Sequence, residues 1–223
     1  MEFVLFKKLA SLEGVEVWLL LAALAVAAVL LLGILRYRRS DAPVPAPRAN
    51  ATRALVYGAL CVSLSFILSY VKLFSLPMGG SITLCAMLPV AMYAAMFGPR
   101  YGFVAGLALG VLQLMQDFYV VHWAQLILDY FIAYACYGLA SLFPKQLRLG
   151  LLAAGVGRLI CSTLSGVIFF AEYAEGWGSV WAYSLAYNGS YIGAETLLCV
   201  IIASLPALKR LMDTMQTGRG GAA

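Results

Sequence analysis

The chain has 223 residues, of which 63% are hydrophobic and 11% are charged, and its formal net charge is +5. Soluble domains average about 45–50% apolar and about 25% charged residues, so this composition excludes a soluble enzyme, a disordered chain and a secreted disulfide scaffold. A membrane-spanning helix needs about 20 mostly apolar residues, and the chain has material for about seven. We therefore expect a polytopic helical membrane protein.

Seven apolar runs predict the spans in chain order. The first lies at about 17–35, and a proline-alanine segment typical of an extended linker follows at 40–52. The other six runs lie at 54–74, 81–97, 100–116, 123–143, 150–171 and 181–206. The predicted fold is an all-α integral membrane protein with an accessory N-terminal transmembrane helix (1–39), a linker (40–52), a six-helix membrane domain (53–210) and a cytoplasmic tail (211–223).

Basic residues at the ends of these runs predict the orientation of the spans. They lie at 36–39, 53, 100, 145–148 and 209–210. Because positive charge accumulates in cytoplasmic loops, the N-terminus is predicted outside and the C-terminus in the cytoplasm. Basic residues at the ends of spans in a lipid bilayer account for the positive net charge, so no nucleic-acid partner is expected.

Small residues predict where helices approach one another closely. Gly102, Gly106 and Gly110 recur at every fourth residue of one span, a spacing that lets a neighbouring helix pack tightly. Ala59 and Ser63 form a shorter patch of small residues on the first core span. That patch could face a neighbouring core helix or a partner membrane protein.

Polar groups inside the spans are the candidate binding residues, because an ionisable group in hydrocarbon needs a partner or a function. Asp129 lies about six residues into its span from the outer side, roughly 9 Å deep. Asn188 lies at nearly the same depth in the last span. Gln125 shares a helix face with Asp129, since it lies four residues earlier.

Aromatic residues gather at the same level. Tyr183 and Tyr130 lie within the spans, and Tyr119 and Trp177 approach from the outer loops. A carboxylate in an aromatic-walled pocket complements an organic cation, because the ring faces add cation–π attraction. The interpretation that competes with a binding site is an interfacial belt of aromatic residues around a snorkelling Asp129.

Two further charged groups lie deeper in the membrane. Arg158 and Glu195 are predicted at matching depth, whereas Arg158 and Asp129 differ by about 10 Å along the membrane normal. We therefore predict a structural Arg158–Glu195 pair. The chain shows no catalytic set, metal-ligand cluster or phosphate-binding glycine loop, so no enzymatic activity, metal or cofactor is expected.

Four segments resemble the thiamine-specific substrate-binding (S) component of bacterial energy-coupling factor transporters. They are residues 76–84 (LPMGGSITL), 125–130 (QLILDY), 165–170 (SGVIFF) and 183–191 (YSLAYNGSY). The resemblance covers about residues 53–210. It implies a six-helix protein of the bacterial cell membrane that binds one thiamine near its outer face. It also implies docking on a membrane scaffold subunit with two ATPase subunits, which alone would use ATP.

The resemblance also assigns roles to individual residues. It places the acidic ligand of the cationic thiazolium at Asp129. The remaining thiamine ligands fall on aromatic and amide positions: Tyr119, Tyr130, Tyr183 and Asn188. The small-residue patch that the family uses against the scaffold subunit falls on Ala59 and Ser63.

Two positions depart from the family pattern and leave alternatives open. Ser162 stands where family members have a histidine, and Phe170 stands where they have a stacking tryptophan. Phe170 and Trp177 are expected in the aromatic wall, and Ser162 among the polar ligands. The alternatives are a subunit for a thiamine precursor or related vitamin, a stand-alone proton-coupled transporter with Asp129 or Glu195 as the proton carrier, and a structural membrane protein without a ligand.

Overall fold

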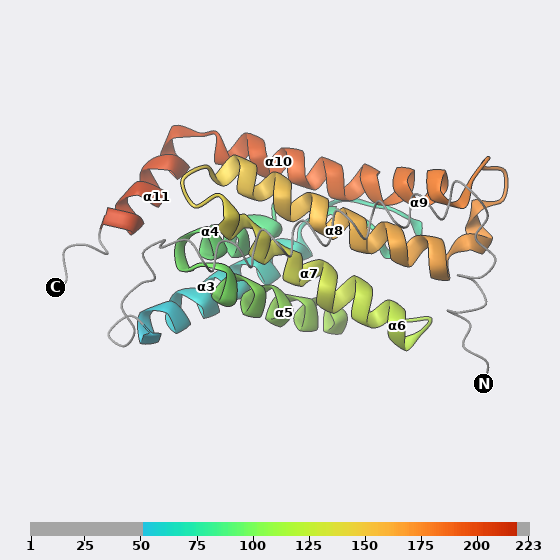
Figure 1. Cartoon of the computed structure of the whole chain (residues 1–223), viewed down its shortest axis with the longest axis horizontal. Coiled ribbons are helices and arrows are strands. Elements are labelled where there is room, and N and C mark those ends of the chain that lie inside the picture. The colour runs from blue at the N-terminus through green and yellow to red at the C-terminus, as the bar shows by residue number, and fades with distance from the viewer. Residues whose placement is uncertain (1–50, 218–223) are drawn as a thin grey trace.

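The structure is a computed structural model that describes residues 51–217, a bundle of helices with one short β-hairpin (Figure 1). Residues 1–50, with the predicted accessory helix and nearly all of the linker, lie outside the described residues, as do residues 218–223. Within the described part, four helices are long and apolar enough to cross a membrane. They are residues 51–70, 123–142, 147–169 and 180–203.

The elements follow one another with short connections. The first half of the bundle contains α3 (Ala51–Tyr70), β1 (Lys72–Ser75), the 3-10 turn η1 (Pro77–Gly79), β2 (Ser81–Thr83), α4 (Met87–Phe97) and α5 (Pro99–Gln116). The span at 123–142 is built from α6 (Trp123–Leu126), η2 (Ile127–Ile132), α7 (Ala133–Ala135) and η3 (Cys136–Leu142). The remaining elements are α8 (Leu147–Phe169), η4 (Ala171–Ala174), α9 (Val180–Asn188), η5 (Gly189–Gly193), α10 (Ala194–Ala203) and α11 (Pro206–Thr217).

Each of the six predicted core runs contains a helix, but the run predicted at 81–97 is helical only from Met87 onward. Residues 81–83 form strand β2, which pairs antiparallel with β1 because the chain reverses at Met78 and Gly79, whose φ angles are 64° and 90°. A second positive φ, 56° at Cys85, separates the strand from α4. The 11 residues of α4 rise only about 16 Å, about half of a hydrocarbon core.

The C-terminal boundary also differs from the prediction. Helix α11 continues to Thr217 and so enters the segment 211–223 that was predicted as a tail. The helix is tied to the bundle by Met212, which is buried and belongs to the main hydrophobic core.

The core of the bundle is built around α4. All 11 residues of this helix are buried, as expected for a helix that is apolar on every side. Helices α3, α5, α8 and η3 pack against it. The hydroxyl of Tyr93 in α4 donates a hydrogen bond to the carbonyl oxygen of Ala54 in α3, at 2.9 Å.

The glycine stripe of α5 packs closely, as predicted, against the span at 123–142. A side chain at Gly110 would meet the carbonyl oxygen of Tyr130, and one at Gly106 would meet that of Tyr134. A side chain at Gly102 would meet Ala94 of α4 first and Gly138 of this span next. This close approach presses the η2 segment, which carries Asp129, against α5.

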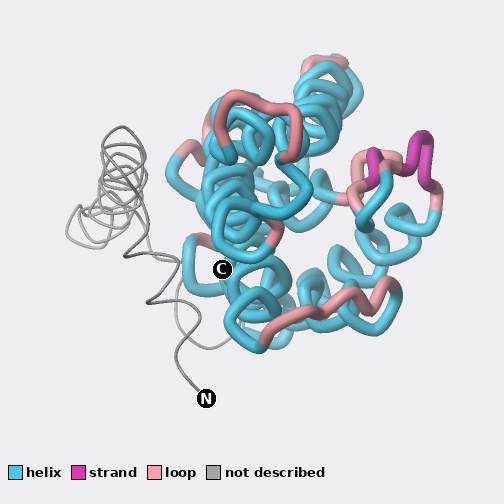
Figure 2. Tube along the Cα trace, turned by 90° about the vertical axis from the view of Figure 1, so that its right-hand side faces the viewer, coloured by secondary structure: helices cyan, strands magenta, loops and turns pink. Residues whose placement is uncertain are grey.

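The two ends of the bundle differ. The β-hairpin, the loop at 117–122 and η4 lie at one end, which we call the hairpin end; α11 and the start of α3 lie at the other (Figure 1). Figure 2, which looks along the bundle, shows the hairpin strands in magenta beside the helices. The pocket described next opens among the elements of the hairpin end.

Candidate functional site

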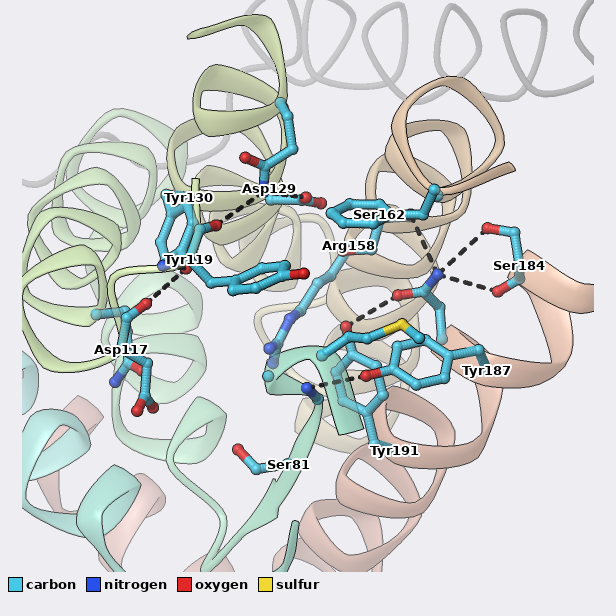
Figure 3. A pocket seen from close by; sticks show the side chains of 18 of the residues that line it. Ser81, Asp117, Tyr119, Asp129, Tyr130, Arg158, Ser162, Ser184, Tyr187 and Tyr191 are labelled. Atoms are coloured by element: carbon cyan, nitrogen blue, oxygen red, sulfur yellow. Dashed lines mark hydrogen bonds between the residues drawn. The ribbon is translucent and has the colours of Figure 1, made fainter. Parts of the chain in front are cut away.

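A pocket lies between the hairpin, the span at 123–142, α8 and α9 (Figure 3). The sequence analysis expected nine residues in the binding site, and eight of them line this pocket. They are Tyr119, Gln125, Asp129, Tyr130, Ser162, Phe170, Tyr183 and Asn188. The ninth, Trp177, is half exposed and lies outside the lining; its ring meets the Tyr183 ring edge-on at 5.7 Å.

Asp129 is held by neutral hydrogen-bond donors. The side-chain amide of Gln125 donates to Asp129 Oδ2 at 2.9 Å, and the hydroxyl of Ser165 donates to the same oxygen at 2.6 Å. The Ser162 side chain also interacts with this carboxyl group. Among the described residues, no hydrogen bond or ion pair joins Asp129 to a basic side chain.

Both spans that carry predicted ligands contain a π-helical turn at the level of the pocket. Asp129 lies within η2 (Ile127–Ile132), and Asn188 directly precedes η5 (Gly189–Gly193). A π turn adds a residue to a helical turn, which redirects the side chains around it, and such turns are frequent at functional sites. Apolar periodicity does not reveal them.

The amide of Asn188 is already engaged by the protein. Its nitrogen donates to the carbonyl oxygens of Ser184 and Ser162, at 2.9 and 3.2 Å, and its oxygen accepts from the Tyr191 hydroxyl at 2.9 Å. A ligand can therefore reach Asn188 through the second lone pair of the amide oxygen.

Aromatic rings form two walls of the pocket. Tyr119 and Phe170 stack with ring centroids 6.0 Å apart, and Tyr183 stacks with Tyr187 at 6.2 Å. The hydroxyl of Tyr130 donates to the backbone carbonyl of Asp117 at 2.6 Å and accepts from the Tyr119 amide at 3.3 Å. The side chain of Tyr130 thus fixes the loop that carries Tyr119.

The hairpin supplies a wall that the sequence analysis did not assign to the site. Tyr187 holds the hairpin tip, since its hydroxyl donates to the Pro77 carbonyl oxygen and accepts from the Gly80 amide at 3.1 Å. Gly80 fits there because a side chain would meet the Tyr187 hydroxyl and the Tyr191 ring. The spacing of Tyr183, Tyr187 and Tyr191 at every fourth residue was the sequence signal for this wall.

Arg158 and Glu195 lie together, as the depth argument predicted. Arg158 Nη1 lies 3.2 Å from Glu195 Oε2 and 2.6 Å from the Tyr137 hydroxyl, and Glu195 Oε1 accepts from the Thr83 hydroxyl at 2.5 Å. The guanidinium carbon lies 4.8 Å from the centre of the Tyr134 ring. Arg158 also lines the pocket, a position that the sequence analysis did not expect.

The small-residue patch lies on the surface of the described chain. Ala59 and Ser63 are exposed on α3, together with the large side chains of Leu55, Leu60 and Ile67. The alternative that the patch faces a neighbouring core helix is therefore wrong for the helices that the structure describes.

The comparisons with known proteins agree on one family. The family model described as "Thiamine transporter protein (Thia_YuaJ)" matches residues 55–214. The chain is 30% identical over 148 residues to the thiamine transporter ThiT of Bacillus subtilis (strain 168), a match that covers 59% of this chain and 77% of that protein. A solved structure of ThiT from Listeria monocytogenes matches with a TM-score of 0.63 and 24% identity over 75% of this chain and 97% of that one, a likeness of fold.

Proposed function

The chain belongs to the thiamine transporter protein family, and from that membership we propose that it is the thiamine-binding membrane subunit of an ATP-driven energy-coupling factor uptake transporter. Transport is a non-enzymatic function, and the chain is accordingly not an enzyme. We propose, in addition, how the chain binds thiamine, how it is coupled to ATP and how it is oriented in the membrane.

The observation that carries the proposal is the balance of charge around the pocket. Arg158 is balanced by Glu195, and Asp117 at the pocket edge is balanced by Lys72, 2.7 Å away. Asp129 has only neutral donors among the described residues. A carboxylate away from water and without a directly paired cation is costly, and the permanent positive charge of the thiazolium ring of thiamine would pair with it.

The shape and chemistry of the walls support a particular placement of thiamine. The thiazolium ring would lie against Asp129 and the stacked rings of Tyr119 and Phe170, where cation–π attraction adds to the charge pairing. The aminopyrimidine ring would lie toward Tyr183 and Asn188. Their hydroxyl and amide groups offer hydrogen bonds to the edge of a heterocycle.

Coupling to ATP requires partner subunits, because the sequence contains no phosphate-binding glycine loop. The exposed patch of Ala59 and Ser63 on α3 would let a helix of a membrane scaffold subunit approach closely. Two ATPase subunits would act through that scaffold. In this arrangement the hairpin end faces outside and receives thiamine, and α11 faces the cytoplasm.

Thermal unfolding of the detergent-purified chain tests thiamine binding directly. A ligand present at about 100 times its dissociation constant stabilises the folded state by about 2.7 kcal/mol, so thiamine should raise the unfolding temperature while riboflavin and biotin should not. A folded protein that thiamine does not stabilise would contradict the proposal, and the pyrimidine precursor would then be the next candidate.

Uptake measurements test the coupling. In cells that lack the ATPase module, the chain alone should not accumulate thiamine. Accumulation that an uncoupler abolishes would instead identify a stand-alone proton-coupled transporter.

A further inference from the structure

We propose that Ser165, together with Gln125, is a positioning residue for the Asp129 carboxylate, and that both act on thiamine binding through Asp129. The inference rests on the proposed function, which makes Asp129 the partner of the thiazolium cation. It gives Ser165 a role in the site although that residue does not line the pocket, and it changes the expected role of Gln125 from ligand to support.

The two donors approach the carboxylate from different elements. Ser165 lies on α8, is fully buried, and places its hydroxyl 2.6 Å from Asp129 Oδ2. Gln125 lies one turn before Asp129 on the same span, is 2% exposed, and places its amide nitrogen 2.9 Å from the same oxygen. Because both bonds end on Oδ2 and come from different elements, they hold the plane of the carboxylate, which lines the pocket.

The neutrality of these donors matters for binding a cation. Hydrogen bonds to an ionised group are stronger than those between neutral groups, so Ser165 and Gln125 stabilise the charge of Asp129 in a buried site. They do not cancel that charge, as an arginine would. The carboxylate is therefore held in a fixed orientation by donors that carry no charge of their own.

Gln125 also connects the carboxylate to the aromatic wall. Its amide oxygen accepts from the backbone amide of Val121, and its amide nitrogen donates to the carbonyl oxygen of Tyr119, both at 3.3 Å. The Tyr119 ring stacks on Phe170. One side chain thus sets both the orientation of Asp129 and the position of the loop that carries the stacking ring.

Substitutions on α8 offer a matched comparison. Ser165→Ala should weaken thiamine binding roughly tenfold, since it removes one hydrogen bond to a charged group. Ser165→Thr retains the hydroxyl and should restore most of the affinity. The control is Thr163→Val, because the buried Thr163 hydroxyl has no hydrogen-bond partner among the described residues; it should leave the affinity unchanged.

A double-mutant cycle separates positioning from a general effect on the fold. Thiamine affinity is measured by calorimetric titration of the full chain for Ser165→Ala and Gln125→Met, each with Asp129 present and in the Asp129→Asn background. If both residues act through the carboxylate, their substitutions should cost roughly tenfold with Asp129 present and less than about twofold without it. If Ser165→Ala does not fold, the cycle of Gln125→Met with Asp129→Asn still tests the proposal.

The outcomes that would overturn the inference are distinct from those that would overturn the proposed function. Wild-type protein that binds no thiamine would overturn both. Thiamine binding that falls by the same factor with Asp129 present and in the Asp129→Asn background would leave the proposed function standing. It would show that Ser165 and Gln125 support only the packing of the spans, and the inference would be wrong.

Discussion

Two carboxylates, the buried Glu195 and the half-buried Asp129, lie inside the same bundle, and they differ in what surrounds their charge. Glu195 faces the guanidinium of Arg158 and accepts a second hydrogen bond from Thr83. Asp129 accepts its hydrogen bonds from Ser165 and Gln125, which carry no charge. The first carboxylate belongs to an ion pair built into the protein, and the second has hydrogen bonds but, among the described residues, no direct ion pair with a basic side chain.

The difference teaches how a buried acid becomes a binding group. A carboxylate that forms an ion pair with a basic side chain of the protein is neutralised before any ligand binds. It therefore contributes to the stability of the fold. A carboxylate held only by neutral donors keeps its affinity for a cation. Arg158 lines the same pocket as Asp129, so closeness to the pocket does not distinguish a structural charge from a binding charge. The two are distinguished by whether the charge is paired within the protein.

The largest effect is expected from a substitution that breaks the Arg158–Glu195 ion pair. Arg158→Ala should lower the free energy of unfolding by about 3–5 kcal/mol, because it leaves Glu195 buried without a counterion. Arg158→Ala combined with Glu195→Ala should recover much of this loss, measured as the unfolding temperature without ligand. Equal and additive losses from the two single substitutions would show that the residues do not act as a pair.

The next effect concerns the carboxylate held by neutral donors. Asp129→Asn should leave the unfolding temperature without ligand nearly unchanged while lowering thiamine affinity roughly tenfold to hundredfold, from the loss of a charged partner. The same substitution should change the affinity for a neutral pyrimidine analogue less than about threefold. Equal losses for both ligands would assign Asp129 a structural role and remove the contrast with Glu195.

Position along the spans was enough to predict which polar groups meet. Helical rise sets the depth of each residue, so Asp129 and Asn188 could be predicted at one level, and Arg158 and Glu195 at another. Composition likewise indicated the helical membrane fold. These features depend on spacing within single helices, which a sequence records directly.

Other features depend on contacts between distant segments. The hairpin forms because β1 pairs with β2 after a reversal at Met78 and Gly79, and apolar content alone made its second strand look like part of a span. The engagement of Asn188 by Ser184 and Tyr191 depends on side-chain packing around a π turn. Neither leaves a periodic signal along the chain.

A smaller effect distinguishes the ring that lines the pocket from the ring outside it. Phe170→Leu should weaken thiamine binding about threefold to tenfold, since a cation–π contact is worth about 0.5–2 kcal/mol. Trp177→Leu should cost less than about twofold, because Trp177 lies outside the pocket lining. Titration of both variants decides the point, and a larger loss at Trp177 would mean that thiamine sits nearer the pocket mouth than Asp129.

The smallest effect concerns a third carboxylate, Asp117, which is paired like Glu195 but exposed. Lys72 Nζ lies 2.7 Å from Asp117 Oδ2, with the two side chains 30% and 41% exposed. Exposed ion pairs contribute about 0–1 kcal/mol and are screened by salt. Lys72→Met should therefore change thiamine affinity less than about fivefold, and the difference from wild type should shrink at high salt. A salt-independent loss as large as that of Asp129→Asn would show that this pair holds the hairpin over the bound ligand, and that exposure does not set the importance of a charge in this protein.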